Sequence, residues 1–138
     1  MPSFADLAVG DELPPLTKSL DRADLVKYAA GSGDFNPLHF DPEFPQAREI
    51  GDNIVHGRLK YAALGQLVSD WLEHQGWVRR LSAQYRGMDR RGAPFSCRGR
   101  VSALSEEAGL GVVELELWTE SAEGERTTTG SAEVVLRG

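Results

Sequence analysis

Hydrophobic residues follow a helical period in the first part of the chain and a strand period after about residue 77. The clearest helical pattern is "HGRLKYAALGQLVSDWLEHQG", residues 56–76. Its apolar side chains recur at spacings of three and four, at Leu59, Ala62, Ala63, Leu67, Val68, Trp71 and Leu72. An apolar face this wide is typical of a helix that another layer of the protein covers.

Two further helices are predicted before this one. The first covers "RADLVKYAAG", residues 22–31, with Asp21 as its N-cap and its last glycine as the stop signal. The second is short and covers Pro42–Arg48, because an Asp-Pro pair with Asp41 as the cap is typical of a helix start. The segment Leu13–Leu20 contains two consecutive prolines and is expected to be extended.

The last part of the chain predicts an antiparallel sheet. Four segments alternate apolar and polar residues and are separated by turn-forming sequences: "VRRLSAQYRG", "FSCRGRVSAL", "VVELELWTE" and "TTTGSAEVVLR". A long buried helix followed by such strands indicates an α+β fold. The economical arrangement is a single domain, residues 1–138, in which the sheet wraps around the helix.

Composition restricts the class of protein. With 41% hydrophobic and 26% charged residues over 138 positions, the chain is typical of a globular domain. Its net charge of -6 argues against bulk binding to nucleic acid or to acidic membranes. The apolar run Leu59–Leu72 is interrupted by charged residues, so no membrane span is predicted, and no secretory signal is visible. Cys97 is the only cysteine, which excludes an intrachain disulfide and favours a cytoplasmic location.

The stretch "GSGDFNPLHFD", Gly31–Asp41, holds the candidate chemistry. It combines glycines and a proline with an acid and an imidazole, Asp34 and His39, and with three apolar side chains that we expect to pack the loop down: Phe35, Leu38 and Phe40. A histidine titrates near neutrality, and a nearby carboxylate can orient it or share protons with it. The loop therefore indicates an acid–base site.

The segments "SGDFNPLHFDPEFPQA" and "IVHGRL" closely resemble the signature of the MaoC-like, or R-specific, enoyl-CoA hydratases and 3-hydroxyacyl-thioester dehydratases. The resemblance extends from "FADLAVGDELP" to the last predicted strand. It implies a hot-dog fold, an antiparallel sheet wrapped around one long central helix. It also implies a hydro-lyase of fatty acid metabolism, which adds water reversibly to a trans-2-enoyl thioester to give the (3R)-3-hydroxyacyl product.

The resemblance assigns roles to individual residues. Asp34 and His39 would hold and activate one water molecule, and the backbone amide of Gly57 would bind the thioester oxygen at the start of the long helix. Asn36 and His56 are further candidates for the substrate-binding group, although the simpler interpretation of Asn36 is structural and that of His56 is a buried histidine bonded to the backbone. No organic cofactor is implied.

Three other features have competing interpretations. His39, Asp41 and His56 are metal-ligand types, but their spacing matches neither a zinc signature nor a calcium loop, so no metal is predicted. Cys97 lies at an inward position of a predicted strand, which disfavours a Cys-His nucleophile. Arg58 and Lys60 follow the His-Gly pair, where cations oppose the helix dipole, so they either extend away from the site or meet substrate phosphate or an acid of a partner subunit.

The segment from Gly76 to Arg100 contains seven arginines and one acid, Asp89. Arg80, Arg86, Arg98 and Arg100 are expected on the wet face of the sheet, paired with Glu114 and Glu116. Arg90 and Arg91 lie in the loop "MDRRGAP" and are the better candidates for contacts with coenzyme A phosphates.

The leading hypothesis is a hydratase or dehydratase that acts on acyl-CoA or acyl-carrier-protein substrates. The alternatives are a non-catalytic partner subunit of a hetero-oligomeric hydratase and a hot-dog acyl-CoA thioesterase. Because the sheet leaves an edge strand that needs cover, we expect a homodimer or larger homo-oligomer, with a homologous partner chain as the second possibility. In the family the acyl site lies at this shared boundary. No nucleic-acid or membrane partner is expected.

Overall fold

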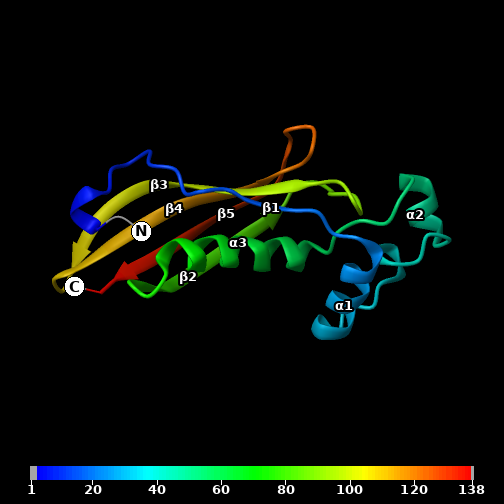
Figure 1. Ribbon diagram of the computed structural model, residues 1–138, viewed down its shortest axis with the longest axis horizontal. Helices are drawn as coiled ribbons and strands as arrows, with labels where there is room; N and C mark the ends of the chain where they lie inside the picture. Colours follow the sequence, from blue (N-terminus) through cyan, green and yellow to red (C-terminus); the bar gives the residue numbers. More distant parts are fainter. Residues whose placement is uncertain (1–2, 138) are drawn as a thin grey trace.

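The computed structural model describes residues 3–137 and contains a five-stranded antiparallel sheet with helix α3 packed along one of its faces (Figure 1). The strands lie in the order β1-β3-β4-β5-β2. The strands are β1 Leu16–Lys18, β2 Gly76–Tyr85, β3 Phe95–Glu107, β4 Leu110–Glu120 and β5 Arg126–Leu136. The helices are α1 Arg22–Ser32, α2 Pro45–Ile50 and α3 Gly57–Leu72, with short 3-10 turns at Phe4–Asp6 and Pro37–His39.

The four predicted strands are confirmed as β2 to β5, and the extended segment before α1 contributes a fifth. Strand β1 pairs with β3 over Leu16–Lys18, in the register Leu16 to Cys97 and Lys18 to Phe95. Three residues are too few to show a strand period, and so the sequence predicted an extended segment without predicting its pairing.

The helices before α3 differ from the prediction at their ends. Helix α1 begins after Asp21, which forms a capping box with Asp24, and it ends at Gly33 in the left-handed conformation, two residues after the predicted stop. The predicted helix Pro42–Arg48 is wrong in its position, because α2 begins only after Phe44, with Pro45 at its first position. Asp41 is not the cap of α2, and its carboxylate accepts a hydrogen bond from the Glu43 amide within a turn.

The core lies between α3 and the concave face of the sheet. Helix α3 packs against β2, β3, β4 and β5, and Figure 1 shows it running along the sheet while α1 and α2 lie beyond one end. Its buried side chains include Ala63, Leu64, Leu67, Val68 and Leu72, and they meet inward residues of the strands such as Leu115, Leu117 and Val134. Lys60 is buried on the same face, which the hydrophobic pattern did not predict.

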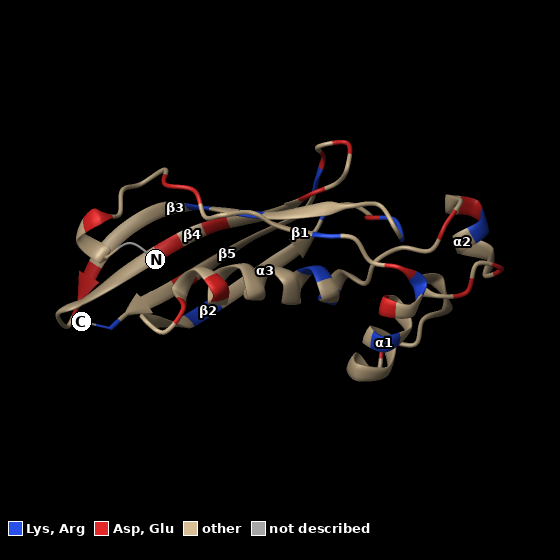
Figure 2. Ribbon diagram, viewed as in Figure 1, with Lys and Arg blue, Asp and Glu red and all other residues tan. Residues whose placement is uncertain are grey.

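Charged residues of both signs occur along strands β3 and β4 (Figure 2), and several of them form ion pairs across the strands. Arg100 lies 2.6 Å from Glu116, and Arg98 lies 3.4 Å from Glu120, as the wet-face interpretation predicts for arginines. The prediction that Glu114 pairs with one of these arginines is wrong, because no ion pair within residues 3–137 includes Glu114. Arg80 lies 3.8 Å from Glu133 instead, and Arg86 bonds to the Gln84 side chain.

In the described part of the chain, no helix combines the length and the apolar character that crossing a membrane would require.

Candidate active site

Asp34 lies in the connection between α1 and the turn Pro37–His39. Its amide donates a hydrogen bond to the Ser32 hydroxyl at 3.2 Å, and its Oδ1 atom accepts one from the Asn36 amide at 3.3 Å. Asn36 in turn accepts a bond from the Leu38 amide through its side-chain oxygen. Asn36 therefore has the structural role considered above, since it caps the turn that places His39. Phe35 is 60% exposed, so the prediction that it packs the loop down is wrong.

His39 faces Asp34 through one ring nitrogen and the backbone through the other. Its Nε2 atom lies 3.8 Å from Oδ2 of Asp34, and its Nδ1 atom lies 2.9 Å from the carbonyl oxygen of Ile54. A carbonyl oxygen only accepts hydrogen bonds, so Nδ1 carries the proton of the neutral ring and Nε2 presents its lone pair toward Asp34. The Asp34 side chain is 40% exposed and that of His39 is 11% exposed, which leaves the pair accessible from the Asp34 side.

His56 lies directly behind this pair. Its ring is stacked on that of His39, with centroids 3.8 Å apart and an angle of 21° between the planes, and Tyr28 meets it edge-on. Its Nε2 atom lies 3.3 Å from the backbone oxygen of Asp34, whereas Nδ1 has no hydrogen-bond partner within residues 3–137. The ring is fully buried, and burial together with the neighbouring His39 lowers the pKa of His56. This is the buried histidine of the simpler interpretation, and its position favours support of the pair over contact with a ligand.

Gly57 is the first residue of α3, directly after His56. The first amides of a helix have no intrahelical acceptor, and the helix dipole adds positive potential there. The Tyr85 ring covers Gly57 so closely that a Cβ atom at this position would lie 3.0 Å from the ring. Tyr85, at the end of β2, thus adjoins the candidate site, a contact that the sequence did not predict.

Asn53 is a second residue that the sequence analysis missed. Its side chain is fully buried, and its amide group donates hydrogen bonds to the backbone oxygens of Leu38 and Asp41, both at 2.9 Å. These two bonds hold both ends of the segment that contains His39. A buried asparagine that satisfies two carbonyl groups fixes the local backbone. The only sequence signal was its place in the turn after α2.

The two candidate phosphate-binding arginines have different surroundings. Arg91 forms a two-point ion pair with Asp52, at 3.0 and 3.2 Å, and it is thus already engaged within the chain. Arg90 is exposed, and its side chain has no hydrogen-bond or ion-pair partner in the part of the chain that the structure describes. Of the two arginines, Arg90 therefore remains the candidate for contacts with coenzyme A phosphates.

The two cations after Gly57, Arg58 and Lys60, also have different surroundings. Arg58 is exposed, as one alternative for this pair required. Lys60 is 1% exposed and lies 3.1 Å from the Asp89 carboxylate. For Lys60 all of the predicted alternatives are wrong, because it turns inward and meets an acid of its own chain.

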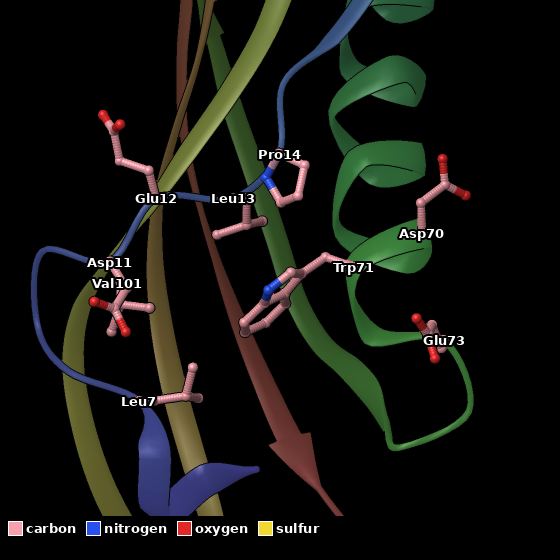
Figure 3. Close-up of a pocket in the computed structure, with 9 residues that line it drawn as sticks. All are labelled: Leu7, Asp11, Glu12, Leu13, Pro14, Asp70, Trp71, Glu73 and Val101. Atoms are coloured by element: carbon pink, nitrogen blue, oxygen red, sulfur yellow. The ribbon is translucent and has the colours of Figure 1, made fainter. Parts of the chain in front are cut away.

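Two other observations bear on ligands. Ligand-type atoms of Asp34, His39 and His56 lie within 4.8 Å of one another, so the polar cluster contains Asp34 in place of the Asp41 that we considered as a metal ligand. A separate cavity of about 520 Å³ lies between the last turn of α3, the segment before β1, and β3 (Figure 3). Trp71 points into it, and acidic residues such as Asp11 and Asp70 stand at its edge. It contains none of the predicted catalytic residues.

Comparison with known proteins gives consistent results. The model of the MaoC like domain family matches residues 8–102. The chain is 30% identical to the (R)-specific enoyl-CoA hydratase of Aeromonas caviae over 135 residues, which cover 97% of this chain and 98% of that protein. It is 38% identical over 63 residues to the mitochondrial 3-hydroxyacyl-[acyl-carrier-protein] dehydratase of Arabidopsis thaliana, covering 46% of this chain and 37% of that one. The solved (R)-hydratase from A. caviae superimposes with a TM-score of 0.86 at 28% identity, over 96% of this chain and 98% of that chain.

Proposed function

This chain belongs to the MaoC-like domain family, and from that premise we propose that it catalyses the reversible addition of water to a trans-2-enoyl thioester, giving the (3R)-3-hydroxyacyl thioester. The predicted hot-dog fold and the predicted class of enzyme, a hydro-lyase, are confirmed by the named hydratase and dehydratase relatives. The assignment of Asp34 and His39 as the catalytic pair is our proposal. The observation that carries it is the approach of His39 Nε2 to Asp34 Oδ2 at 3.8 Å.

That separation suits two groups that bind the same water molecule. It is longer than a direct hydrogen bond, yet both atoms can accept hydrogen bonds from the two hydrogens of one water molecule beside them. In the proposed reaction His39 Nε2 accepts a proton from this water while the oxygen forms a bond to C3 of the substrate. Asp34 orients the water through its second hydrogen, and the pair returns a proton to C2, so that one water is added in total.

The negative charge that develops on the thioester oxygen needs fixed donors. The amide of Gly57 at the start of α3 is the proposed donor, because it adjoins His56, which touches both members of the pair. The absence of a side chain at Gly57 leaves room for the carbonyl group next to the Tyr85 ring. Arg90 is the proposed contact for a phosphate of the carrier, either coenzyme A or the phosphopantetheine of a carrier protein.

We also propose that the chain forms at least a dimer through strand β2. This strand is the last in the sheet order and is ten residues long, so one of its edges is unpaired among the described strands. Trp77 and Tyr85 on this strand are 43% and 52% exposed, which favours cover by a second copy. Sedimentation equilibrium tests this, and a monomer at every concentration would contradict it. The buried single thiol, Cys97, supports the proposed cytoplasmic location.

The hydration proposal is tested with purified protein and crotonyl-CoA. Loss of the enone absorbance, with formation of the (3R) product on chiral analysis, is the expected result. Release of free thiol in the same reaction, followed with a thiol reagent, would instead identify a thioesterase. Neither reaction over a series of CoA and carrier-protein thioesters of increasing chain length would contradict the proposal and favour a non-catalytic subunit.

A further inference from the structure

Lys60 and Asp89 form an ion pair in the interior of the protein, with each side chain 2% exposed. Lys60 Nζ lies 3.1 Å from Asp89 Oδ2 and also donates a hydrogen bond to the Gly87 carbonyl at 3.0 Å. The same carboxylate oxygen accepts a bond of 2.5 Å from the Thr127 hydroxyl, which lies 2.9 Å from that of Thr119. Both charges are thus compensated by directional partners, as buried charges require.

Lys60 connects this network to the start of α3. It is the fourth residue of the helix, and its own amide donates a hydrogen bond of 3.3 Å to the carbonyl of His56, the residue before Gly57. Its side chain extends from the first turn of the helix to the loop after β2. The position of the Gly57 amide relative to that loop is therefore fixed through Lys60.

Asp89 connects the same network to the residues that hold His39. Its backbone oxygen accepts a hydrogen bond from the Val55 amide at 2.8 Å, and the next residue, Arg90, forms a β-bridge with Ile54. The Ile54 carbonyl oxygen is the partner of His39 Nδ1. Asp89 therefore contacts helix α3 through its carboxylate, which binds Lys60. Its backbone contacts the segment Ile54–Val55, which holds His39.

We propose that Lys60 and Asp89 are a positioning pair, which fixes the start of α3 and the Ile54 carbonyl in one relative geometry and so sets the orientation of the His39 ring toward the Gly57 amide. The inference deepens the proposed function and rests on it. Both side chains are closed to solvent, so they act through other residues and do not contact the substrate.

The chemistry of the pair suits this role better than an apolar contact. Hydrogen bonds from an ammonium group to a carboxylate and a carbonyl fix distance and direction, whereas packed hydrocarbon of the same volume tolerates small shifts. Displacement of a reacting group by about 1 Å costs on the order of a hundredfold in rate. A network that prevents such a shift is therefore valuable at this site even where it adds little to stability.

The informative variant is the double substitution Lys60→Met with Asp89→Leu, which removes both charges and keeps the side-chain shapes. Either single substitution leaves a buried charge without a partner, and loss of folding is the expected result. The matched control is Thr128→Val, because Thr128 is also buried, is paired with Thr119 in the sheet, and has a hydroxyl without a partner within residues 3–137. Thr127→Val is a milder change that removes one donor to Asp89 and keeps both charges.

Two measurements distinguish positioning from stability alone. The first is kcat and KM with crotonyl-CoA, for which we expect kcat to fall by roughly ten- to a hundredfold in the folded double variant while KM changes little. The second is the tautomer of His39, read from its ring nitrogen shifts by NMR. Three histidines make this spectrum simple, and the signal is assigned with His39→Gln. We expect one tautomer in the wild type and a mixture in the double variant.

Retention of the wild-type tautomer and kcat in a folded double variant would overturn the inference and leave the pair a role in stability only. If the double variant does not fold, Thr127→Val decides the question by the same two measurements, with a smaller change in the same direction expected. A wild type that is inactive on every thioester would contradict the proposed function, and the tautomer of His39 would still decide whether the pair positions that ring.

Discussion

The imidazole rings of His39 and His56 are stacked, with their centroids 3.8 Å apart. Two imidazolium rings at this distance would repel each other. His56 is fully buried, whereas solvent can reach the His39 ring from the side of Asp34. Burial and the adjacent His39 both lower the pKa of His56. The fold therefore disfavours protonation of His56, which supports our proposal that His39, and not His56, is the ring that acts on the water.

The lowered pKa of His56 predicts that stability decreases in acid. In the unfolded chain His56 takes up a proton as the pH falls through about 6.5, whereas the folded state resists this until the pH reaches its lower folded pKa. The free energy of unfolding should therefore fall between these two pKa values, and His56→Asn should weaken this dependence. Urea titrations at several pH values measure it. His74→Asn removes an exposed histidine and is the control, and an equal effect of both changes would argue against the assignment.

Asp34→Asn and His39→Gln should each lower kcat by about 10²- to 10⁴-fold, the usual effect of removing a general acid or base. Because the two groups are proposed to share one water, the double variant should lose little more than either single one. Hydration of crotonyl-CoA, with folding checked by circular dichroism, measures both effects. Asp41→Asn changes a neighbouring acid whose carboxylate serves a turn, and it should retain activity. Full turnover by Asp34→Asn and His39→Gln would remove the proposed mechanism.

Gly57→Ala should reduce kcat/KM by roughly tenfold, because the new Cβ atom would lie 3.0 Å from the Tyr85 ring and would enter the space beside the proposed oxygen-binding amide. The variant Gly57→Ala with Tyr85→Ala separates the two causes. Recovery of activity would identify the contact with the ring, and continued loss would identify obstruction of the substrate. Gly65→Ala, in the same helix, meets only ordinary contacts at 3.4 Å and should be active.

The thiol of Cys97 should not react with Ellman's reagent in the native protein at pH 8. Burial raises the pKa of this thiol to about 12, so almost no thiolate is present, and the side chain is fully buried. One equivalent should react after unfolding in guanidinium. Ser96→Cys places a thiol at the partly exposed neighbouring position and should react in the native state. Fast labelling of native Cys97 would show that the sheet opens readily around it.

The helices and strands that bury one face were predictable, because burial of one face gives their hydrophobic residues a regular spacing in the sequence. Helix α3 and strands β2 to β5 follow from this period, and the cap of α1 follows from the chemistry of Asp21. Short elements were less predictable, since β1 depends on pairing with β3 and α2 depends on where the chain can turn after Asp41.

The same distinction explains the site. Asp34 and His39 are five positions apart and belong to one local motif, which the sequence shows directly. Asn53, Tyr85 and Asp89 obtain their roles from contacts with residues distant in sequence. Lys60, in particular, was unexpected in the sequence because a cation in the first turn opposes the helix dipole. Only its contact with Asp89, 29 positions later, explains why a cation lies in the core.

Asn53, Ile54 and Val55 divide three tasks among successive residues. The first bonds to the loop through its side chain, the second to His39 through its carbonyl oxygen, and the third to Asp89 through its amide. In an extended segment the side chains and carbonyl groups of successive residues point in opposite directions. Inserting or deleting one residue here would therefore turn these groups away from their partners, even if every side chain were kept. The length of this connection is therefore as important for the proposed chemistry as the identities of Asp34 and His39.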